Sequence, residues 1–257
     1  MAKLCPLFSG SSGNSYYIEA SGSGILVDAG RSAKQIENAI KRVQAIFVTH
    51  EHSDHIKGVR VLASRYHIPV YSSRGTLEGM EEAGALSEKF SADVIGWEGM
   101  EVANMRVVPF RTPHDSRESI GFCIHTSDGR KIAIATDLGY FSQTVFEAVS
   151  GCDIAVIESN HDVRMLQNGF YPYYLKRRIL SKQGHLSNEA CAGELPAFAQ
   201  SGTTRFVLAH LSQENNIPEL AYQTALCSLQ ACGMKQGLDF ELMVAPRENI
   251  GGHTILF

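Results

Sequence analysis

The chain has 257 residues, of which 44% are hydrophobic and 19% are charged, and its formal net charge is −4. This composition is typical of a globular protein, and it excludes a disordered chain, a membrane-spanning bundle and a globally basic nucleic-acid binder. A chain of this length can bury enough surface to fold without a disulfide or a structural metal. We expect a single domain over residues 1–257.

The N-terminal residues contain no apolar segment of signal-peptide length, and no stretch of the sequence is long enough to span a membrane. The six cysteines are scattered without a C-x-x-C pair. We therefore predict a cytoplasmic protein whose cysteines are buried thiols not joined in disulfides. These residues are Cys5, Cys123, Cys152, Cys191, Cys227 and Cys232.

A Gly/Ser-rich loop and an aspartate mark the first elements of the chain. The loop spans residues 9–15 and precedes a strand-like segment at Tyr16–Ile18. A second apolar strand, residues 24–27, ends at Asp28. By itself, Asp28 is suited to cap the helix that we expect to begin near Ser32.

The densest group of potential metal ligands follows an apolar strand at residues 45–48. The segment reads His50-Glu51-His52-Ser53-Asp54-His55. Its imidazoles cannot all face one way on a regular strand or helix, so we place them on an irregular turn. Imidazole nitrogens and carboxylate oxygens bind Zn²⁺, and Mn²⁺ or Fe²⁺ can also use them. The segment therefore predicts a metal site; the alternative is a histidine-rich surface loop.

Strands and helices alternate along the chain, a pattern typical of helices that flank a sheet. We predict helices over residues 34–43, 56–66, 73–83 and 218–233. Further strands are predicted over residues 68–71, 105–110, 120–125, 131–136, 154–157, 204–209 and 240–244. Several of these strands lead into polar residues, namely His114, Asp137, Glu158 and His210.

The order of these residues resembles the metallo-β-lactamase superfamily. The pattern of that family has an Asp after an early strand, an H-x-H-x-D-H motif, and then a His, an Asp and a final His at strand ends. Here Asp28, the motif from His50, His114, Asp137 and His210 fill these positions in order. The resemblance implies an α/β fold in four layers, an αβ/βα sandwich with the metal site at one edge of its sheets.

The resemblance also implies a dinuclear centre of two divalent metal ions, with zinc and manganese both possible. One ion would be held by His50, His52 and His114, the other by Asp54, His55 and His210, and Asp137 would bridge them. Asp54 would also orient the attacking hydroxide, and Asp28 would orient a ligating histidine from the second shell. A closed structural zinc site fits less well, because it takes four ligands and commonly uses thiolates.

Two later positions resemble the ribonuclease Z branch of the superfamily. Glu158 and His185 stand where those enzymes carry a glutamate and a histidine that protonate the leaving oxygen. Alternatively, His185 simply precedes a helix that starts near Ser187. His161 is a further candidate for the second shell, or it belongs to a plain polar loop. The chain lacks the long exosite insertion of ribonuclease Z and the inserted cap of the β-CASP nucleases.

Over nearly its whole length the chain resembles the bacterial YycJ/WalJ group. The matching segments are residues 10–15, 160–162, 184–188 and 210–212. This resemblance implies a cytoplasmic, metal-dependent hydrolase that acts as a DNA exonuclease in the 5′-to-3′ direction. The run Lys176-Arg177-Arg178, beside the tyrosines of residues 171–174, would follow the substrate backbone. The alternative for this run is a solvated helix face with its tyrosines packed inward.

Two other functions are compatible with the same residues. A small-molecule ester, thioester or lactone hydrolase would need a closed apolar pocket over the metals, whereas a nuclease would need an open groove lined by basic side chains. A metal-binding sensor without turnover is the third hypothesis, and it would not require the Glu158 and His185 pair. The choice between DNA and RNA and the oligomeric state are left open by the sequence.

Overall fold

A computed structural model of the chain describes residues 2–37, 42–249, 252 and 254–256. The chain divides into two compact units. The first unit comprises Met1–Phe110, Ser116–Arg130 and Pro246–Phe257, and the second comprises Arg111–Asp115 and Lys131–Ala245. Because neither unit is one continuous stretch, each depends on chain segments that are far apart in the sequence.

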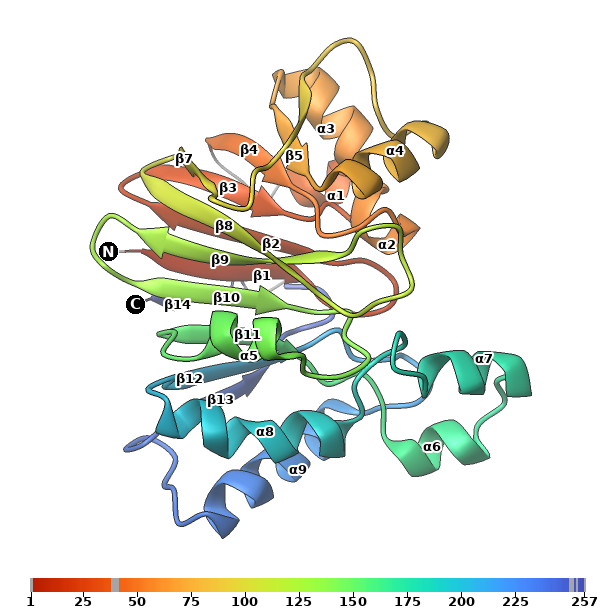
Figure 1. Ribbon diagram of the computed structural model, residues 1–257, viewed down its shortest axis with the longest axis vertical. Helices are drawn as coiled ribbons and strands as arrows, with labels where there is room; N and C mark the ends of the chain where they lie inside the picture. Colours follow the sequence, from red (N-terminus) through yellow and green to blue (C-terminus); the bar gives the residue numbers. More distant parts are fainter. Residues whose placement is uncertain (1, 38–41, 250–251, 253, 257) are drawn as a thin grey trace. The chain divides into compact units, whose positions relative to one another are not determined.

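Within the described ranges, seven strands form one sheet of the first unit (Figure 1). They are β1 (Lys3–Phe8), β2 (Ser15–Ala20), β3 (Ser23–Val27), β4 (Val43–Phe47), β5 (Val70–Ser72), β6 (Ala92–Val94) and β14 (Ile255–Leu256). Their order is β14-β1-β2-β3-β4-β5-β6. The strands from β3 to β6 are parallel, and Val27 at the end of β3 pairs with Phe47 at the end of β4. Asp28 and His50 therefore leave the same edge of this sheet.

The first unit also contains the strands β7 (Met100–Val102), β8 (Met105–Arg111) and β9 (Ile120–Thr126), in the order β9-β8-β7. The ring of Phe122 on β9 packs edge-on against the ring of Phe47 on β4, with centroids 5.4 Å apart. Both rings are fully buried, so the two groups of strands share an apolar core.

The helices of the first unit, among the residues that the structure describes, are α1 (Ala33–Glu37), α2 (Ser53–Ile56), α3 (Val59–Tyr66) and α4 (Arg74–Glu82). Their apolar residues join those of the strands in one buried cluster, which includes Leu26, Ile36, Ile46, Leu62 and Met80. Burial of such side chains contributes on the order of 1.5–3 kcal/mol each to folding.

The predicted helix boundaries agree with the structure at α4 but not at α1. The helix predicted over residues 73–83 is α4, and the Ser73 hydroxyl caps it by accepting from the Thr76 amide. The helix predicted over residues 34–43 is shorter, because Val43 pairs with Gly24 and begins β4. Residues 38–41 lie outside the described part of the chain.

The second unit is built on four parallel strands in the order β13-β12-β11-β10. They are β10 (Lys131–Ala135), β11 (Ile154–Glu158), β12 (Arg205–Ala209) and β13 (Glu241–Val244). Every residue of β11 is buried, as expected for a parallel strand with neighbours on both sides. Glu158 pairs in register with Ala209, so the polar residues that follow these strands emerge at one edge of the sheet.

The helices of the second unit are α5 (Gln143–Val149), α6 (Val163–Asn168), α7 (Tyr173–Ile179), α8 (Asn188–Gln200) and α9 (Pro218–Ala231). Helices α8 and α9 lie side by side (Figure 1), and α9 also contacts β13. No helix within the described ranges is sufficiently long and apolar to traverse a membrane.

The prediction that all cysteines are buried is wrong for two of them. Cys5, Cys123, Cys152 and Cys191 are buried, but Cys227 and Cys232 are exposed. Both lie at the C-terminal end of α9, which buries Ala221, Ala225 and Leu229 along its other face. Among the residues that the structure describes, no disulfide joins any of the cysteines.

Three predicted site residues adopt a left-handed backbone one or two residues after the end of a strand. The φ angles are 59° at Asp28, 61° at Asp137 and 55° at His210. This conformation is uncommon for residues other than glycine and costs on the order of 1–3 kcal/mol at each position. Its recurrence at three strand ends marks these residues as functional candidates independently of their chemistry.

Candidate metal centre

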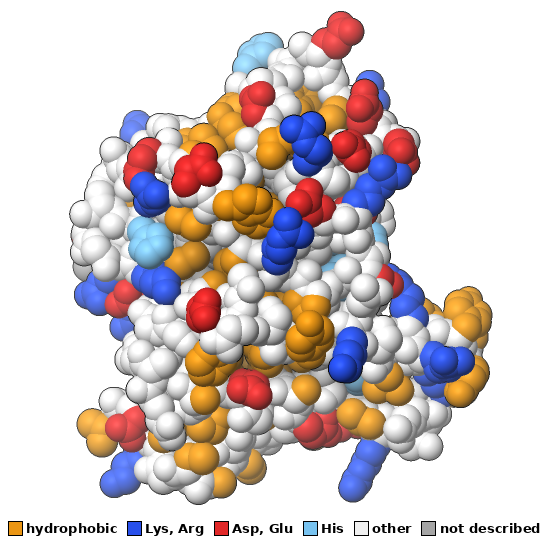
Figure 2. Space-filling model, viewed as in Figure 1, with side chains coloured by type: hydrophobic (Ala, Val, Ile, Leu, Met, Phe, Trp, Pro, Cys, Tyr) orange, Lys and Arg blue, Asp and Glu red, His pale blue; other side chains and the backbone are white. Residues whose placement is uncertain are grey.

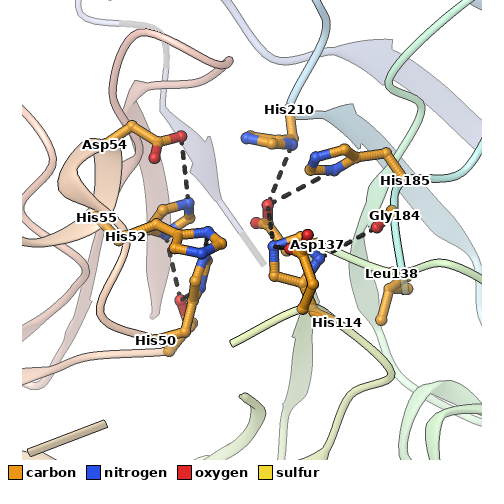
Figure 3. Close-up of polar contacts among 12 residues, drawn as sticks. His50, His52, Asp54, His55, His114, Asp137, Leu138, Gly184, His185 and His210 are labelled. Atoms are coloured by element: carbon orange, nitrogen blue, oxygen red, sulfur yellow. Dashed lines mark hydrogen bonds and ion pairs between the residues drawn. The ribbon is translucent and has the colours of Figure 1, made fainter. Parts of the chain in front are cut away.

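The histidine motif of the first unit gathers its side chains at the end of β4. His50 and His52 lie on the loop after the strand, whereas Asp54 and His55 lie on the short helix α2. His50 Nε2 is 3.0 Å from His52 Nδ1, and His55 Nε2 is 3.6 Å from Asp54 Oδ2 (Figure 3). The irregular turn predicted here is thus confirmed for the first half of the motif, and its second half is helical.

Asp28 supports this motif from the neighbouring strand. Its Oδ2 lies 2.8 Å from His55 Nδ1, and its Oδ1 accepts from the Thr49 amide at 2.8 Å. The Thr49 hydroxyl donates to Asp28 Oδ2 at 2.9 Å. Both carboxylate oxygens are therefore engaged with the motif, so the alternative role as a helix cap is not the one that Asp28 has in the structure.

The Gly/Ser-rich loop reaches the motif through Asn14. The Asn14 amide nitrogen Nδ2 is 3.1 Å from His55 Nε2 and 3.5 Å from Asp54 Oδ2. Its backbone nitrogen donates to the Asp54 carbonyl at 2.8 Å. Gly30 allows this approach, since a Cβ atom at Gly30 would lie 1.6 Å from the same carbonyl oxygen. Neither Asn14 nor Thr49 was identified individually from the sequence.

In the second unit, one buried carboxylate holds two histidines. Glu158 Oε1 lies 2.8 Å from His185 Nδ1 and 2.8 Å from His210 Nδ1. Its Oε2 accepts from the backbone amides of Leu138, at 2.7 Å, and Leu186, at 3.2 Å. Burial would raise the pKa of Glu158, but the charge of His185 and the hydrogen bonds from both rings lower this pKa well below its ordinary value.

Asp137 and His114 complete this second group. Asp137 Oδ1 lies 3.5 Å from His210 Nδ1 and 3.7 Å from His114 Nε2. Burial lowers the pKa of His114, which favours the neutral imidazole that can ligate a metal. Possible ligand atoms of Asp137, Glu158, His185 and His210 all lie within 4.8 Å of one another.

The orientation of the imidazoles fits metal ligation. Ligating histidines usually have one ring nitrogen bound to a carboxylate or carbonyl, which leaves the other for the metal. His55 Nδ1 is held by Asp28, His114 Nδ1 lies 3.1 Å from the Gly184 carbonyl, and His210 Nδ1 is held by Glu158. This leaves Nε2 of each ring as the candidate metal donor, and His55 Nε2 also lies 3.1 Å from Asn14 Nδ2. The nitrogen-rich and carboxylate-containing donor set suits a divalent cation such as zinc or manganese.

His161, predicted to support a metal ligand, is buried, and neither ring nitrogen has a hydrogen-bond partner in the part of the chain that the structure describes. Burial lowers the pKa of His161 to about 4. Its neighbour Asn160 contacts a predicted ligand instead, since Asn160 Nδ2 donates to the His210 carbonyl at 2.9 Å. No local sequence signal distinguished Asn160 from His161.

The basic run Lys176-Arg177-Arg178 lies on α7, but its three cations have different roles. Lys176 Nζ donates to the carbonyls of Gln167 and Gly169, at 2.8 and 2.7 Å. Arg178 forms a bidentate ion pair with Asp115, the residue after His114. Arg177 lies over the Tyr173 ring, 6.0 Å from its centroid. Lys176 and Arg178 are thus engaged within the second unit, and the role of the run in following a substrate backbone stays a prediction.

The aromatic residues beside this run face solvent. Tyr173 and Tyr174 are 76% and 75% exposed, and Phe170 is fully exposed. Figure 2 shows Lys and Arg atoms beside hydrophobic atoms over the α7 region. The alternative in which these tyrosines pack inward is thus wrong. Exposed aromatic rings with a nearby cation form a surface suited to stacking on a planar partner.

The comparison with known proteins agrees with this arrangement. The profile of the beta-lactamase superfamily domain matches residues 24–211. Exodeoxyribonuclease YycJ from Bacillus anthracis is 39% identical over 246 residues, which cover 92% of each chain. Exodeoxyribonuclease WalJ from Streptococcus pneumoniae is 38% identical over 250 residues, which cover 93% of each chain.

The solved structures show the fold. The metallo-beta-lactamase fold protein YhfI from Bacillus subtilis has a TM-score of 0.75 and 14% identity, with 100% of both chains covered. The predicted sandwich of mixed β-sheets flanked by helices is therefore confirmed. From the match of the superfamily profile and the identity to YycJ and WalJ over nearly the whole chain, the protein belongs to the metallo-β-lactamase superfamily, in the family of the YycJ and WalJ proteins.

Proposed function

We propose that the protein is a metal-dependent phosphodiesterase that acts as a DNA exonuclease. The observation that carries the proposal is the buried Glu158, which binds both His185 and His210 at 2.8 Å, in a chain 39% identical to exodeoxyribonuclease YycJ. Such an arrangement places a candidate proton donor beside candidate metal ligands, as cleavage of a phosphodiester requires.

In this proposal the protein would hold two divalent cations, zinc or manganese. The ligands are those implied by the family: His50, His52 and His114 for one ion, Asp54, His55 and His210 for the other, with Asp137 shared. Bound divalent cations supply an activated water at neutral pH and neutralise charge on phosphate oxygens. The support is that Asp28, Gly184 and Glu158 each bind Nδ1 of a proposed ligand.

The proposed proton donor to the departing oxygen is His185. Its Nδ1 is bound to Glu158, and its side chain remains 14% exposed, so Nε2 is the nitrogen available to a substrate. The negative charge of Glu158 stabilises a positive charge on the ring, which favours a general acid. Asp54 takes the second catalytic role in this proposal and orients the attacking water, held in place by Asn14.

The substrate strand would meet the second unit at the exposed face of α7. Arg177 supplies a charge for the phosphate backbone, and Tyr173, Tyr174 and Phe170 supply stacking surfaces. Lys176 and Arg178 act indirectly in this proposal, because they bind the carbonyls before α7 and the side chain of Asp115. From the resemblance to the YycJ and WalJ proteins, we also propose that the enzyme is cytoplasmic and works in the 5′-to-3′ direction.

The test is digestion of end-labelled double-stranded DNA and matched RNA by protein reconstituted with manganese or zinc. Progressive loss of label from one end of DNA, absent with Asp137→Ala, is the expected result, and the label position gives the direction. If both metals are bound and neither polymer is cleaved, the small-molecule hydrolase replaces the nuclease. Metal binding without turnover on any ester, thioester or phosphodiester would favour the sensor.

A further inference from the structure

A pocket of about 220 Å³ opens on the first unit, apart from the histidines. Its apolar walls come from Val94, Ile95, Trp97 and Pro109, and Arg74 and Glu118 add charge. Trp97 is 47% exposed and is the only tryptophan of the chain. A half-exposed tryptophan at the wall of a concave site is unusual for a purely structural residue, since its large ring is normally among the more buried ones.

This pocket is connected to the histidine motif by direct hydrogen bonds within the same unit. The backbone nitrogen of Ile120, which lines the pocket, donates to the Thr49 carbonyl at 3.0 Å, and Thr49 immediately precedes His50. Three residues earlier in the chain, the Arg117 amide donates to Glu51 Oε1 at 2.8 Å. The segment 117–120 is therefore both a pocket wall and a support of the motif.

The two charged side chains that line the pocket, Glu118 and Arg74, differ in their contacts with the rest of the protein. Glu118 Oε2 accepts from the Gly75 amide at 2.9 Å, and the Glu118 carbonyl accepts from the Ser73 hydroxyl at 2.6 Å, so Glu118 anchors the start of α4. Arg74 is exposed, and its side chain has no ion-pair or hydrogen-bond partner among the residues described by the structure. Arg74 is thus the charge that remains available to a ligand, and its guanidinium suits a phosphate.

We infer that this pocket binds one nucleotide of the DNA substrate, with its base against Trp97 and its phosphate at Arg74. The inference rests on the proposed function and adds a specific subsite to it. The volume is at the small end for ligand sites, which suits a single base rather than a longer segment. Tryptophan offers every base a stacking face, so the subsite would hold the strand without selecting its sequence.

The single tryptophan makes a direct test possible. Metal-loaded protein is titrated with a deoxynucleoside monophosphate, which contains no phosphodiester to cleave, and the Trp97 fluorescence is followed. We expect saturable quenching in the wild type and about tenfold weaker binding in Arg74→Ala, as for loss of one charge-assisted contact. Lys89→Ala, which removes an exposed cation outside the pocket, should keep the wild-type affinity. Quenching that does not saturate, or that is equal in Arg74→Ala, would overturn the inference.

A second measurement uses the DNA substrate itself. Trp97→Ala should raise KM for single-stranded DNA about tenfold, and Trp97→Phe should restore part of the affinity because it keeps an aromatic face. Tyr66→Ala, at an exposed tyrosine that lines a different pocket, is the matched control and should keep the wild-type KM. An unchanged KM in Trp97→Ala would contradict the subsite.

The two measurements separate this inference from the proposed function. If the wild type binds the nucleotide at Trp97 but degrades no DNA, the nuclease proposal fails and the pocket stands as a nucleotide site. If DNA is degraded while Trp97 shows no quenching and Trp97→Ala has an unchanged KM, the subsite fails and the nuclease stands.

Discussion

The two units obtain their candidate ligands in different ways. In the first unit four of them occur within six consecutive residues, from His50 to His55. In the second unit they come from separated loops, and Asp137 and His210 each follow a different parallel strand. A local motif can therefore be identified from the order of residues alone, whereas the second group exists only because parallel strands end at one edge of a sheet.

The two groups also differ in how they are supported. The histidine motif is held by several partners, which include Asp28, Thr49 and Asn14. In the second unit a single carboxylate, Glu158, orients two rings at once. We therefore expect a single substitution of a supporting residue to impair metal binding more in the second unit than in the first unit. The following predictions test this difference.

The largest effect is expected from Glu158→Gln. The amide cannot accept from both rings with the strength of the buried carboxylate, so His185 and His210 lose their orientation together. We predict a fall in DNA cleavage of about 10³-fold or more, with weaker metal binding. Cleavage rate and metal content are measured in parallel, with Glu219→Gln on the exposed face of α9 as control. Retention of full activity would remove Glu158 from the proposed mechanism.

His185→Ala should slow the chemical step while both metals stay bound. Loss of a general acid typically costs about 10²–10⁴-fold in rate. The loss should shrink on a phosphodiester with a nitrophenolate leaving group, because such a group departs without a proton. Single-turnover rates on the two substrates, with metal content measured beside them, check this prediction. An equal loss on both substrates would indicate a positioning role for His185 and no proton transfer.

We also expect the free energy of unfolding to fall at acidic pH because of His161 in the second unit. Its pKa in the folded protein is about 4, below the value of about 6.5 in an unfolded chain, so the unfolded state takes up the proton first as the pH falls. The contribution of His161 to the free energy of unfolding is therefore fully present above about pH 6.5. It decreases as the pH falls toward about 4, by up to roughly 3 kcal/mol.

The measurement for His161 is urea unfolding at several pH values across this interval. His161→Phe removes the titrating group and keeps most of the buried volume, so its free energy of unfolding should depend less steeply on pH than that of the wild type. Equal slopes for the two proteins would show that His161 does not titrate in this range.

A smaller effect is expected from Asp28→Asn in the first unit. The substitution weakens the contact with His55 Nδ1 but leaves Thr49 and Asn14 in place. We predict metal affinity lower by about 10–100-fold, as is typical for loss of an outer-sphere carboxylate. Competition with a chelator gives the affinity, and Asp93→Asn at an exposed position serves as control. A larger loss than for Glu158→Gln would reverse the comparison between the two units.

The smallest effect is expected from Arg177→Ala on α7. Removal of one backbone contact should weaken single-stranded DNA binding by roughly 5-fold and lower the slope of log K against log salt by about 0.7. Fluorescence anisotropy with a labelled strand at several salt concentrations provides both values. Lys235→Ala, which removes an exposed cation after α9, should change neither. An unaltered salt slope in Arg177→Ala would indicate that the DNA strand binds at a surface other than α7.

The sequence by itself determined the family, the alternating elements and the identity of the candidate ligands. This was possible because buried strands are apolar runs and because the ligands directly follow them, so both leave a local pattern. The H-x-H-x-D-H motif could be named from its local pattern, and the resemblance to the metallo-β-lactamase superfamily then indicated His114, Asp137 and His210.

Only the tertiary structure decided what each polar residue contacts. It assigned both Asp28 oxygens to the motif, joined His185 and His210 through Glu158, and gave Asn160 a hydrogen bond to the His210 carbonyl. It also turned Tyr173 and Tyr174 outward and opened the pocket beside Trp97. These features depend on contacts between residues far apart in the chain and on left-handed turns at strand ends, which no local pattern of residue types encodes.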